Sequence, residues 1–479
     1  MFNGSPAYNG PSLPEISMLD VLTDLIQGQD GYVELRYHEH RGNGFMAQKG
    51  RFDHSGSSIH RGVGIRVLEN GCWGFSSTSD VSPGAIALGI EEARASARSL
   101  VKYRMNKVEG LAEANLSTIS LEDPAYSRLM ELSLEEKIGR VIELERALEK
   151  EHSKIHTALV SYSEIFEEKV IVTTDGAACS RKLVRPEIRT MAYLGEGADQ
   201  VLAGRAVGVT GDWEALFGHH EAQNMVEETA REGLNLLTAD HAPAGLKDVV
   251  LAPSLVGLLC HEAIGHTVEA DFVEAGSVAK GKLGVRVGSE LVSLHDGGQP
   301  ALGEHPAGYL PFDDEGVSCS STTIIEDGVL TSYLHDRESA YRHGQAPMGN
   351  ARAWSYNDEP LIRMTNTWLE PGDMELEGLL EGVEDGLLVL GAGGGQADAN
   401  GEFMFGSSCA REIRSGKLGK WYREASLSGV AFDVLQSIDG LSKDFRWDLG
   451  SGYCGKGQSA KVDAGGPFAR CKMMVGGRL

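Results

Sequence analysis

The chain has 479 residues, which is enough for two or three domains with sizeable hydrophobic cores. Its 44 Lys and Arg against 69 Asp and Glu give a formal net charge of -25, which argues against binding to a nucleic-acid backbone. Apolar residues make up 41% and charged residues 24%, a balance typical of a folded protein and too apolar for a disordered one.

Three further features bear on where the chain works. It has no run of about 18 apolar residues, so no membrane-spanning helix and no membrane partner are expected. The first residues, Met1–Pro6, have neither the basic region nor the apolar core of a secretory signal. The seven cysteines are scattered and form no CxxC pair, as in proteins whose thiols stay reduced. The sequence therefore predicts a cytoplasmic protein.

The first half of the chain carries signals for both helices and strands. Asn70 and Gly71 lie between two apolar runs and predict a tight hairpin turn. Ser82 followed by Pro83, and the capping box of Ser133 and Glu136, each predict the start of a helix. In chain order, the predicted elements are a hairpin over 59–75, a helix from 83 to about 100, a helix from 134 to about 148, strands over 157–174 and 183–194, and a helix over about 220–237.

Residues 238–248 break this periodicity and form the predicted domain boundary. Beyond it, short apolar runs alternate with glycines, a pattern typical of short strands joined by tight turns. These runs lie at 248–256, 284–294, 322–335, 361–367, 387–390, 403–413, 417–421 and 425–439, with one short helix predicted near 256–272. The sequence predicts an α+β fold, with an N-terminal mixed α/β domain over 1–237 and a β-rich C-terminal domain over 238–479.

The most informative motif is His261-Glu262-Ala263-Ile264-Gly265-His266. It is one residue longer than the His-Glu-x-x-His pattern, in which two histidines on one helical face bind a single zinc ion. At a spacing of five, the two histidines lie about 140° apart around a regular α-helix. Both reach one metal ion only if the helix is widened, as in a π-bulge, and Gly265 is the predicted place for that distortion.

A catalytic zinc needs a third protein ligand, and the residues alone leave its identity open. Glu269 and Asp271 follow on the same predicted helix. Cys454 lies far away in the chain, among glycines that leave backbone amides free to support a thiolate. Local sequence favours Cys454 and Glu269 equally.

Two other segments, the glycine-rich run after Leu388 and the acidic residues 313–315, are not predicted to form binding sites. The glycines after Leu388 suggest a dinucleotide loop, but the fingerprint requires a glycine where Gln396 stands, so nucleotide binding is not predicted. The acidic residues Asp313, Asp314 and Glu315 are interpreted as a solvated turn.

Six more blocks carry a resemblance that spans nearly the whole chain. They are Arg61-Gly62-Val63-Gly64-Ile65-Arg66-Val67, Asp313-Asp314-Glu315-Gly316, Met348-Gly349-Asn350-Ala351-Arg352, Arg363-Met364-Thr365-Asn366-Thr367, Gly393-Gly394-Gly395-Gln396 and Cys454-Gly455-Lys456-Gly457-Gln458. With the histidine motif, they make the chain similar to the TldD/PmbA family of metalloproteases, on the TldD side that retains His-Glu-x-x-x-His. The sequence departs from the family pattern at Gln458, which lacks a second preceding glycine, at Cys260, and in the first dozen residues.

The resemblance implies a zinc peptidase with one zinc per chain, although it leaves iron open. Its ligands would be His261, His266 and Cys454, and Glu262 would be the general base that takes a proton from the zinc-bound water. The metal would lie in the β-rich C-terminal domain. Such proteins act on unfolded or extended peptides inside a dimer cleft, as homodimers or as heterodimers with a related subunit that lacks the motif.

One alternative from a different class remains, a non-catalytic peptide-binding subunit of a protease complex. Such a subunit keeps the fold but has no need of a general base. The presence of Glu262 beside His261 therefore favours the peptidase.

Overall fold

The computed structural model describes residues 17–195, 197 and 200–476, and residues Met1–Pro6, considered above for a signal, lie outside this range. Helices and strands occur in both halves of the described chain, so the predicted α+β class is confirmed. Within the described range, no helix is both long and apolar enough to cross a membrane.

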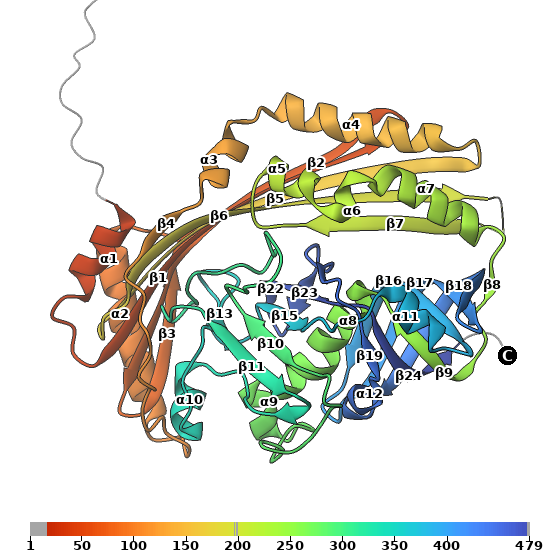
Figure 1. Cartoon of the computed structure of the whole chain (residues 1–479). Coiled ribbons are helices and arrows are strands. Elements are labelled where there is room, and N and C mark those ends of the chain that lie inside the picture. Colours follow the sequence, from red (N-terminus) through yellow and green to blue (C-terminus); the bar gives the residue numbers. More distant parts are fainter. Residues whose placement is uncertain (1–16, 196, 198–199, 477–479) are drawn as a thin grey trace, which may run out of the picture.

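The N-terminal half is built on a seven-stranded sheet in the order β3-β2-β1-β5-β6-β4, with β7 beside β6. Four of its strands have 17 to 19 residues and arch over the C-terminal half (Figure 1). The strands are β1 (Tyr32–Gln48), β2 (Arg51–Glu69), β3 (Cys72–Thr78), β4 (Ser120–Glu122), β5 (Ile155–Thr173), β6 (Ala178–Leu194) and β7 (Val201–Gly208). The predicted hairpin turn is confirmed, since Asn70 and Gly71 both have positive φ, as a two-residue type I′ turn requires.

The helices of this half pack on the sheet where their apolar residues can be buried. α2 begins at Pro83 as predicted, and the capping box of α4 has both hydrogen bonds, from Glu136 N to Ser133 Oγ and from Ser133 N to Glu136. The predicted helix over 220–237 is interrupted at Asn224. The helices are α1 (Met18–Ile26), α2 (Pro83–Leu100), α3 (Pro124–Glu131), α4 (Leu134–Glu151), α5 (Trp213–Gly218), α6 (His220–Gln223) and α7 (Met225–Leu236).

The C-terminal half contains two larger sheets. One has the order β19-β24-β9-β16-β17-β18-β8 and the other the order β12-β11-β10-β15-β23-β20. The first comprises β8 (Asp240–His241), β9 (Gly245–Leu251), β16 (Asp385–Ala397), β17 (Glu402–Arg414), β18 (Lys417–Val430), β19 (Gly440–Leu441) and β24 (Ala469–Gly476). The second comprises β10 (Leu294–Gly297), β11 (Ser321–Glu326), β12 (Val329–Leu330), β15 (Asn366–Leu369), β20 (Arg446–Trp447) and β23 (Asp463–Gly466).

Two short strand pairs and a set of short helices complete this half. The pairs are β13 (Ala351–Arg352) with β14 (Leu361–Ile362), and β21 (Tyr453–Gly455) with β22 (Ser459–Lys461). The helices are α8 (Pro253–Leu258), α9 (Ala270–Ala275), α10 (Arg337–His343), α11 (Leu376–Glu381) and α12 (Ala431–Ser437). α8 contacts β16 of the first sheet and β15 and β23 of the second, so it lies in the core between them (Figure 1). The predicted domain boundary at 237/238 stays a prediction.

The acidic turn at 313–315 is buried, so its interpretation as a solvated turn is wrong. Asp314 accepts hydrogen bonds from Lys169 Nζ of β5, at 2.7 Å, and from Ala353 N, at 2.9 Å. Glu315 accepts a hydrogen bond from Arg66 of β2 at 2.8 Å. The turn therefore joins the C-terminal half to the underside of the long sheet through buried ion pairs.

Candidate metal centre

The helix that carries the two histidines is locally widened. α8 ends at Leu258, residues Leu259–Gly265 form a π-helix, and His266–Val268 form a 3-10 turn. The π-helix predicted from the five-residue histidine spacing is therefore confirmed. Gly265 is the last residue of this π-helix, so it lies within the predicted distortion, and its backbone is helical, with φ -54° and ψ -49°. A Cβ atom there would lie 1.9 Å from the sulfur of Met364, so close packing is what requires glycine.

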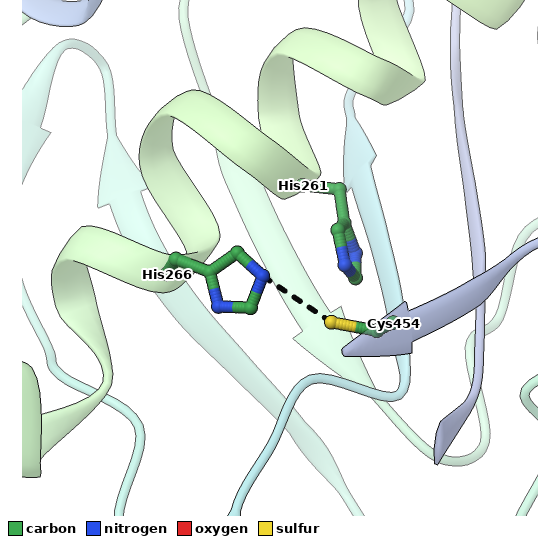
Figure 2. Close-up of side chains that lie close together, drawn as sticks. All are labelled: His261, His266 and Cys454. Atoms are coloured by element: carbon green, nitrogen blue, oxygen red, sulfur yellow. Dashed lines mark hydrogen bonds between the residues drawn. The ribbon is translucent and has the colours of Figure 1, made fainter. Parts of the chain in front are cut away.

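His261, His266 and Cys454 come together although Cys454 is 188 residues from His266 in the chain. One donor atom from each lies within 4.8 Å of the others. Cys454 Sγ is 3.2 Å from His266 Nε2, and Figure 2 shows the ring of His261 pointing from the helix toward Cys454. His261 and Cys454 are each 4% exposed, so this cluster of donors is largely shielded from water.

The electrostatics of the cluster favour a thiolate beside imidazolium groups. Burial opposes the charge of Cys454, but the neighbouring His261 and His266 together lower the pKa of its thiol to about 4. Burial likewise opposes the charge of His266, but its hydrogen bonds to Cys454 and Glu269 raise its pKa to about 10. The pKa of His261 is also raised, against the effect of burial, by the charge of Cys454.

These residues fit a zinc ion. Imidazole nitrogen and thiolate sulfur are both ligands that zinc prefers, and three protein ligands leave a fourth position open. His261 Nδ1 is buried and has no hydrogen-bond partner among the described residues. Orphaned buried nitrogens also occur elsewhere in the described chain, at Arg36 for example, so the fit rests on the three converging donor atoms.

Glu262 lies beside the cluster on its more open side. Its side chain is 25% exposed, and its Oε2 is 3.8 Å from His266 Nε2. Because they are four residues apart, Glu262 and His266 lie on the same helical face, so a carboxylate that can accept protons borders the donors. Its position suits a general base.

The other two ligand candidates, Glu269 and Asp271, lie next to the cluster and bind Lys456. Glu269 is completely buried and accepts hydrogen bonds from His266 Nδ1, at 3.2 Å, and from Lys456 Nζ, at 2.8 Å. Asp271 also accepts a hydrogen bond from Lys456, at 2.8 Å. Neither carboxylate belongs to the group of converging donor atoms, which contains Cys454. The spacing of three residues between His266 and Glu269 is the signal that would have found this contact in the sequence.

The hairpin of β21 and β22, which carries Cys454, is held by a buried arginine. Arg363 is 0% exposed and donates hydrogen bonds to Cys454 O, at 2.6 Å, and to Gln458 O, at 2.9 Å. The Gln458 side chain in turn accepts the Trp354 backbone N–H at 2.7 Å. Sequence reasoning gave Arg363 no role, and an arginine within the apolar run 361–367 was the available signal.

Comparison with known proteins places the chain in a family. Its residues 33–97, 128–237 and 244–477 match models described as PmbA/TldA metallopeptidase domain 1, central domain and C-terminal domain. A metalloprotease of Methanothermobacter thermautotrophicus is 32% identical over 457 residues, which cover 94% of this chain and 97% of that protein. A zinc metalloprotease TldD homolog of Saccharolobus solfataricus is 29% identical over 428 residues, covering 88% and 90%.

A solved structure shows that the fold is shared as well. TldE from Thermococcus kodakarensis matches with a TM-score of 0.74 at 16% identity, covering 95% of this chain and 100% of that one. The resemblance found in the sequence, and the prediction of a metallopeptidase, are confirmed. By its three matched domains and its relatives, the chain belongs to the PmbA/TldD family of metallopeptidases.

Proposed function

We propose that this chain is a zinc-dependent peptidase that hydrolyses unfolded or extended peptides, with Glu262 as the general base. The observation that carries the proposal is the convergence of His261, His266 and Cys454, with Glu262 at the open side of the cluster. The relative named as a zinc metalloprotease supports the choice of zinc.

His261, His266 and Cys454 would hold one zinc per chain. Zinc held there would supply Lewis acidity, which would lower the pKa of a water toward neutrality and polarise the scissile carbonyl. Glu262 accepts the proton of the attacking water and delivers it to the departing amine. Glu269 fixes the His266 ring through Nδ1, so that Nε2 faces the cluster. Because a thiolate ligand partly neutralises the ion, we expect slow turnover compared with peptidases whose zinc has neutral ligands.

The substrate and partners are proposed on more general grounds. An extended peptide added to a sheet edge is held through its main chain, which suits broad specificity. The chain would work in the cytoplasm as a homodimer, or with a related subunit, enclosing a cleft. The structural match to TldE supports a related partner.

Peptide cleavage by the zinc-loaded chain tests the proposal. The substrates are unfolded polypeptides, and the variant Glu262→Gln is compared with Glu290→Gln, whose side chain is 85% exposed, as a matched control. Glu262→Gln should keep about one zinc per chain and lose about 10²–10⁴-fold in cleavage rate. Glu290→Gln should cleave at the rate of the parent.

Two results would contradict the proposal. Cleavage by Glu262→Gln at the parent rate would remove Glu262 from the reaction. A parent that holds zinc and binds unfolded peptides without cleaving them would favour a non-catalytic binding subunit.

A further inference from the structure

Glu269 and Lys456 lie next to the metal centre without belonging to its converging donor atoms. We infer that they form a clasp that positions His266 and the Cys454 hairpin together, and so controls how long the centre retains zinc. The inference rests on the ligand set proposed above, His261, His266 and Cys454, and assigns a positioning role to two residues outside that set.

The first half of the clasp is the contact between Glu269 and His266. Glu269 is 0% exposed and ends the 3-10 turn, and its Oε2 accepts the hydrogen on His266 Nδ1 at 3.2 Å. This bond fixes the tautomer of the imidazole and leaves Nε2 free to face Cys454 Sγ at 3.2 Å. A carboxylate bonded to the far nitrogen of a metal-binding histidine orients the ring and raises its basicity.

The second half is Lys456, at the tip of the hairpin that carries Cys454. Its Nζ lies 2.8 Å from Glu269 Oε2 and 2.8 Å from Asp271 Oδ1, and it donates to Ile362 O at 3.0 Å. The ammonium also lies 4.4 Å from the centre of the Phe272 ring. A single cation therefore joins the helix of His266, the hairpin of Cys454 and strand β14.

The hairpin tip offers little else to hold it against the helix. Lys456 is flanked by Gly455 and Gly457, and a Cβ atom at either glycine would meet nothing within 4 Å. The lysine also stabilises the buried carboxylate of Glu269. Because Glu269 Oε1 has no hydrogen-bond partner among the described residues, the negative charge depends on the ammonium at Oε2 for compensation. Removing Lys456 would both release the tip and leave a buried carboxylate without its cation.

The rate of zinc release to a strong chelator tests the clasp without relying on catalysis. Lys456→Met and Glu269→Gln should each release zinc about 10–100-fold faster than the parent. The double variant should release it no faster than the more severe single variant, since both changes break one connection. Lys456→Arg should recover part of the loss, because it restores a cation.

Asp271→Asn is the matched control. It removes the charge of the other carboxylate bonded to Lys456, and the hydrogen bonds of the described residues do not join that carboxylate to His266. Its release rate should stay close to that of the parent. Urea denaturation of each metal-free variant separates general unfolding from loss of positioning. If Glu269→Gln does not fold, the zinc release rates of Lys456→Met and Lys456→Arg still test the inference.

The clasp is overturned if the parent binds zinc and Lys456→Met releases it at the parent rate. It is also overturned if Asp271→Asn accelerates release as much as Lys456→Met, since any loss of charge would then suffice. A parent that binds no zinc would show that the proposed ligand set is wrong, and the clasp would fail with it. A parent that binds zinc and cleaves nothing would leave the clasp intact while the proposed peptidase fails.

Discussion

The proposed metal centre can be compared with the junction that Asp313, Asp314 and Glu315 form beneath the long sheet. Both bury ionisable side chains, but these side chains have different partners. At the junction, Asp314 accepts hydrogen bonds from Lys169 at 2.7 and 3.0 Å and from the Ala353 backbone at 2.9 Å. Both of its oxygens therefore have protein partners. At the metal centre, Cys454 and His266 face each other at 3.2 Å, and His261 Nδ1 has no partner among the described residues.

The comparison shows that buried charge alone does not mark a site. Burial opposes the charge of Asp314, yet Lys169 and Arg36 hold its pKa well below the usual range, so the carboxylate is fully compensated by the chain itself. A cluster closed in this way serves to join two parts of the fold. Orphaned nitrogens do not separate the two clusters, since Arg36 Nε and Nη1 at the junction are also buried without a hydrogen-bond partner among the described residues. What distinguishes the other cluster is that three donor atoms converge within 4.8 Å, an arrangement suited to a metal ion.

Removing Cys454 should produce the largest difference between the two clusters. In Cys454→Ala, we expect zinc content to fall from about one per chain to nearly none, because two imidazoles alone do not make a stable site. Cys409→Ala is the control, since Cys409 is buried elsewhere and burial raises the pKa of its thiol to about 12. Metal analysis after gel filtration measures the effect. Equal zinc in both variants would mean that the metal uses another third ligand.

Breaking the junction should instead affect stability. Lys169→Met leaves Asp314 buried without its ammonium partner and should lower the free energy of unfolding by about 3–5 kcal/mol. Urea denaturation measures this change, while zinc per folded chain should stay as in the parent. A loss below about 1 kcal/mol would show that water or Arg36 compensates Asp314.

The two clusters also differ in how far the sequence predicts them. The five-residue spacing of His261 and His266 carries its own geometric requirement, so the widened helix could be predicted from those residues. The local sequence could not choose between Cys454 and Glu269, because the choice depends on a hairpin that approaches from the far end of the chain. The family resemblance made that choice.

The junction could not be predicted, because its partners come from distant parts of the chain. Residues 313–315 form an acidic turn, and the buried cations that meet it come from β1, β2 and β5. Strand β1 and the first part of β2 were not predicted, since residues 40–58, which span the end of one and the start of the other, carry glycine, serine and histidine in place of apolar alternation. In the part of β1 near Arg36, the charged face that would normally meet solvent is covered by the C-terminal half.

The pH dependence of the metal-free protein should separate the clusters further. The Cys454 thiol has its pKa lowered from 9.0 to about 4, so the stability it contributes is fully present above pH 9.0 and is lost as the pH falls toward 4. His266 has its pKa raised from 6.5 to about 10, so its contribution is fully present below pH 6.5 and is lost as the pH rises through 10. Between 6.5 and 9.0 the two proton changes cancel.

We therefore expect the stability contributed by this pair to be constant between pH 6.5 and 9.0 and to fall on either side. Urea denaturation of the metal-free parent and of Cys454→Ala isolates the contribution as a difference between the two. The ultraviolet absorbance of the thiolate should disappear in the parent near pH 4 and be missing from the variant. A thiolate that appears only near pH 9 would show that the two histidines do not stabilise it.

The smallest expected effect concerns the packing around the widened helix that carries His261 and His266. Gly265→Ala places a methyl group against the Met364 sulfur, so the variant should lose about 1–3 kcal/mol of stability through overpacking. Gly139→Ala in α4 is the control, because a Cβ there meets nothing within 4 Å and alanine should gain up to about 1 kcal/mol in a helix. Thermal denaturation of the metal-free variants measures both changes in stability, the loss in Gly265→Ala and the gain in Gly139→Ala. If Gly265→Ala is as stable as the parent, Met364 moves aside freely, and the centre owes its geometry to the Arg363 and Lys456 contacts rather than to tight packing around the widened helix.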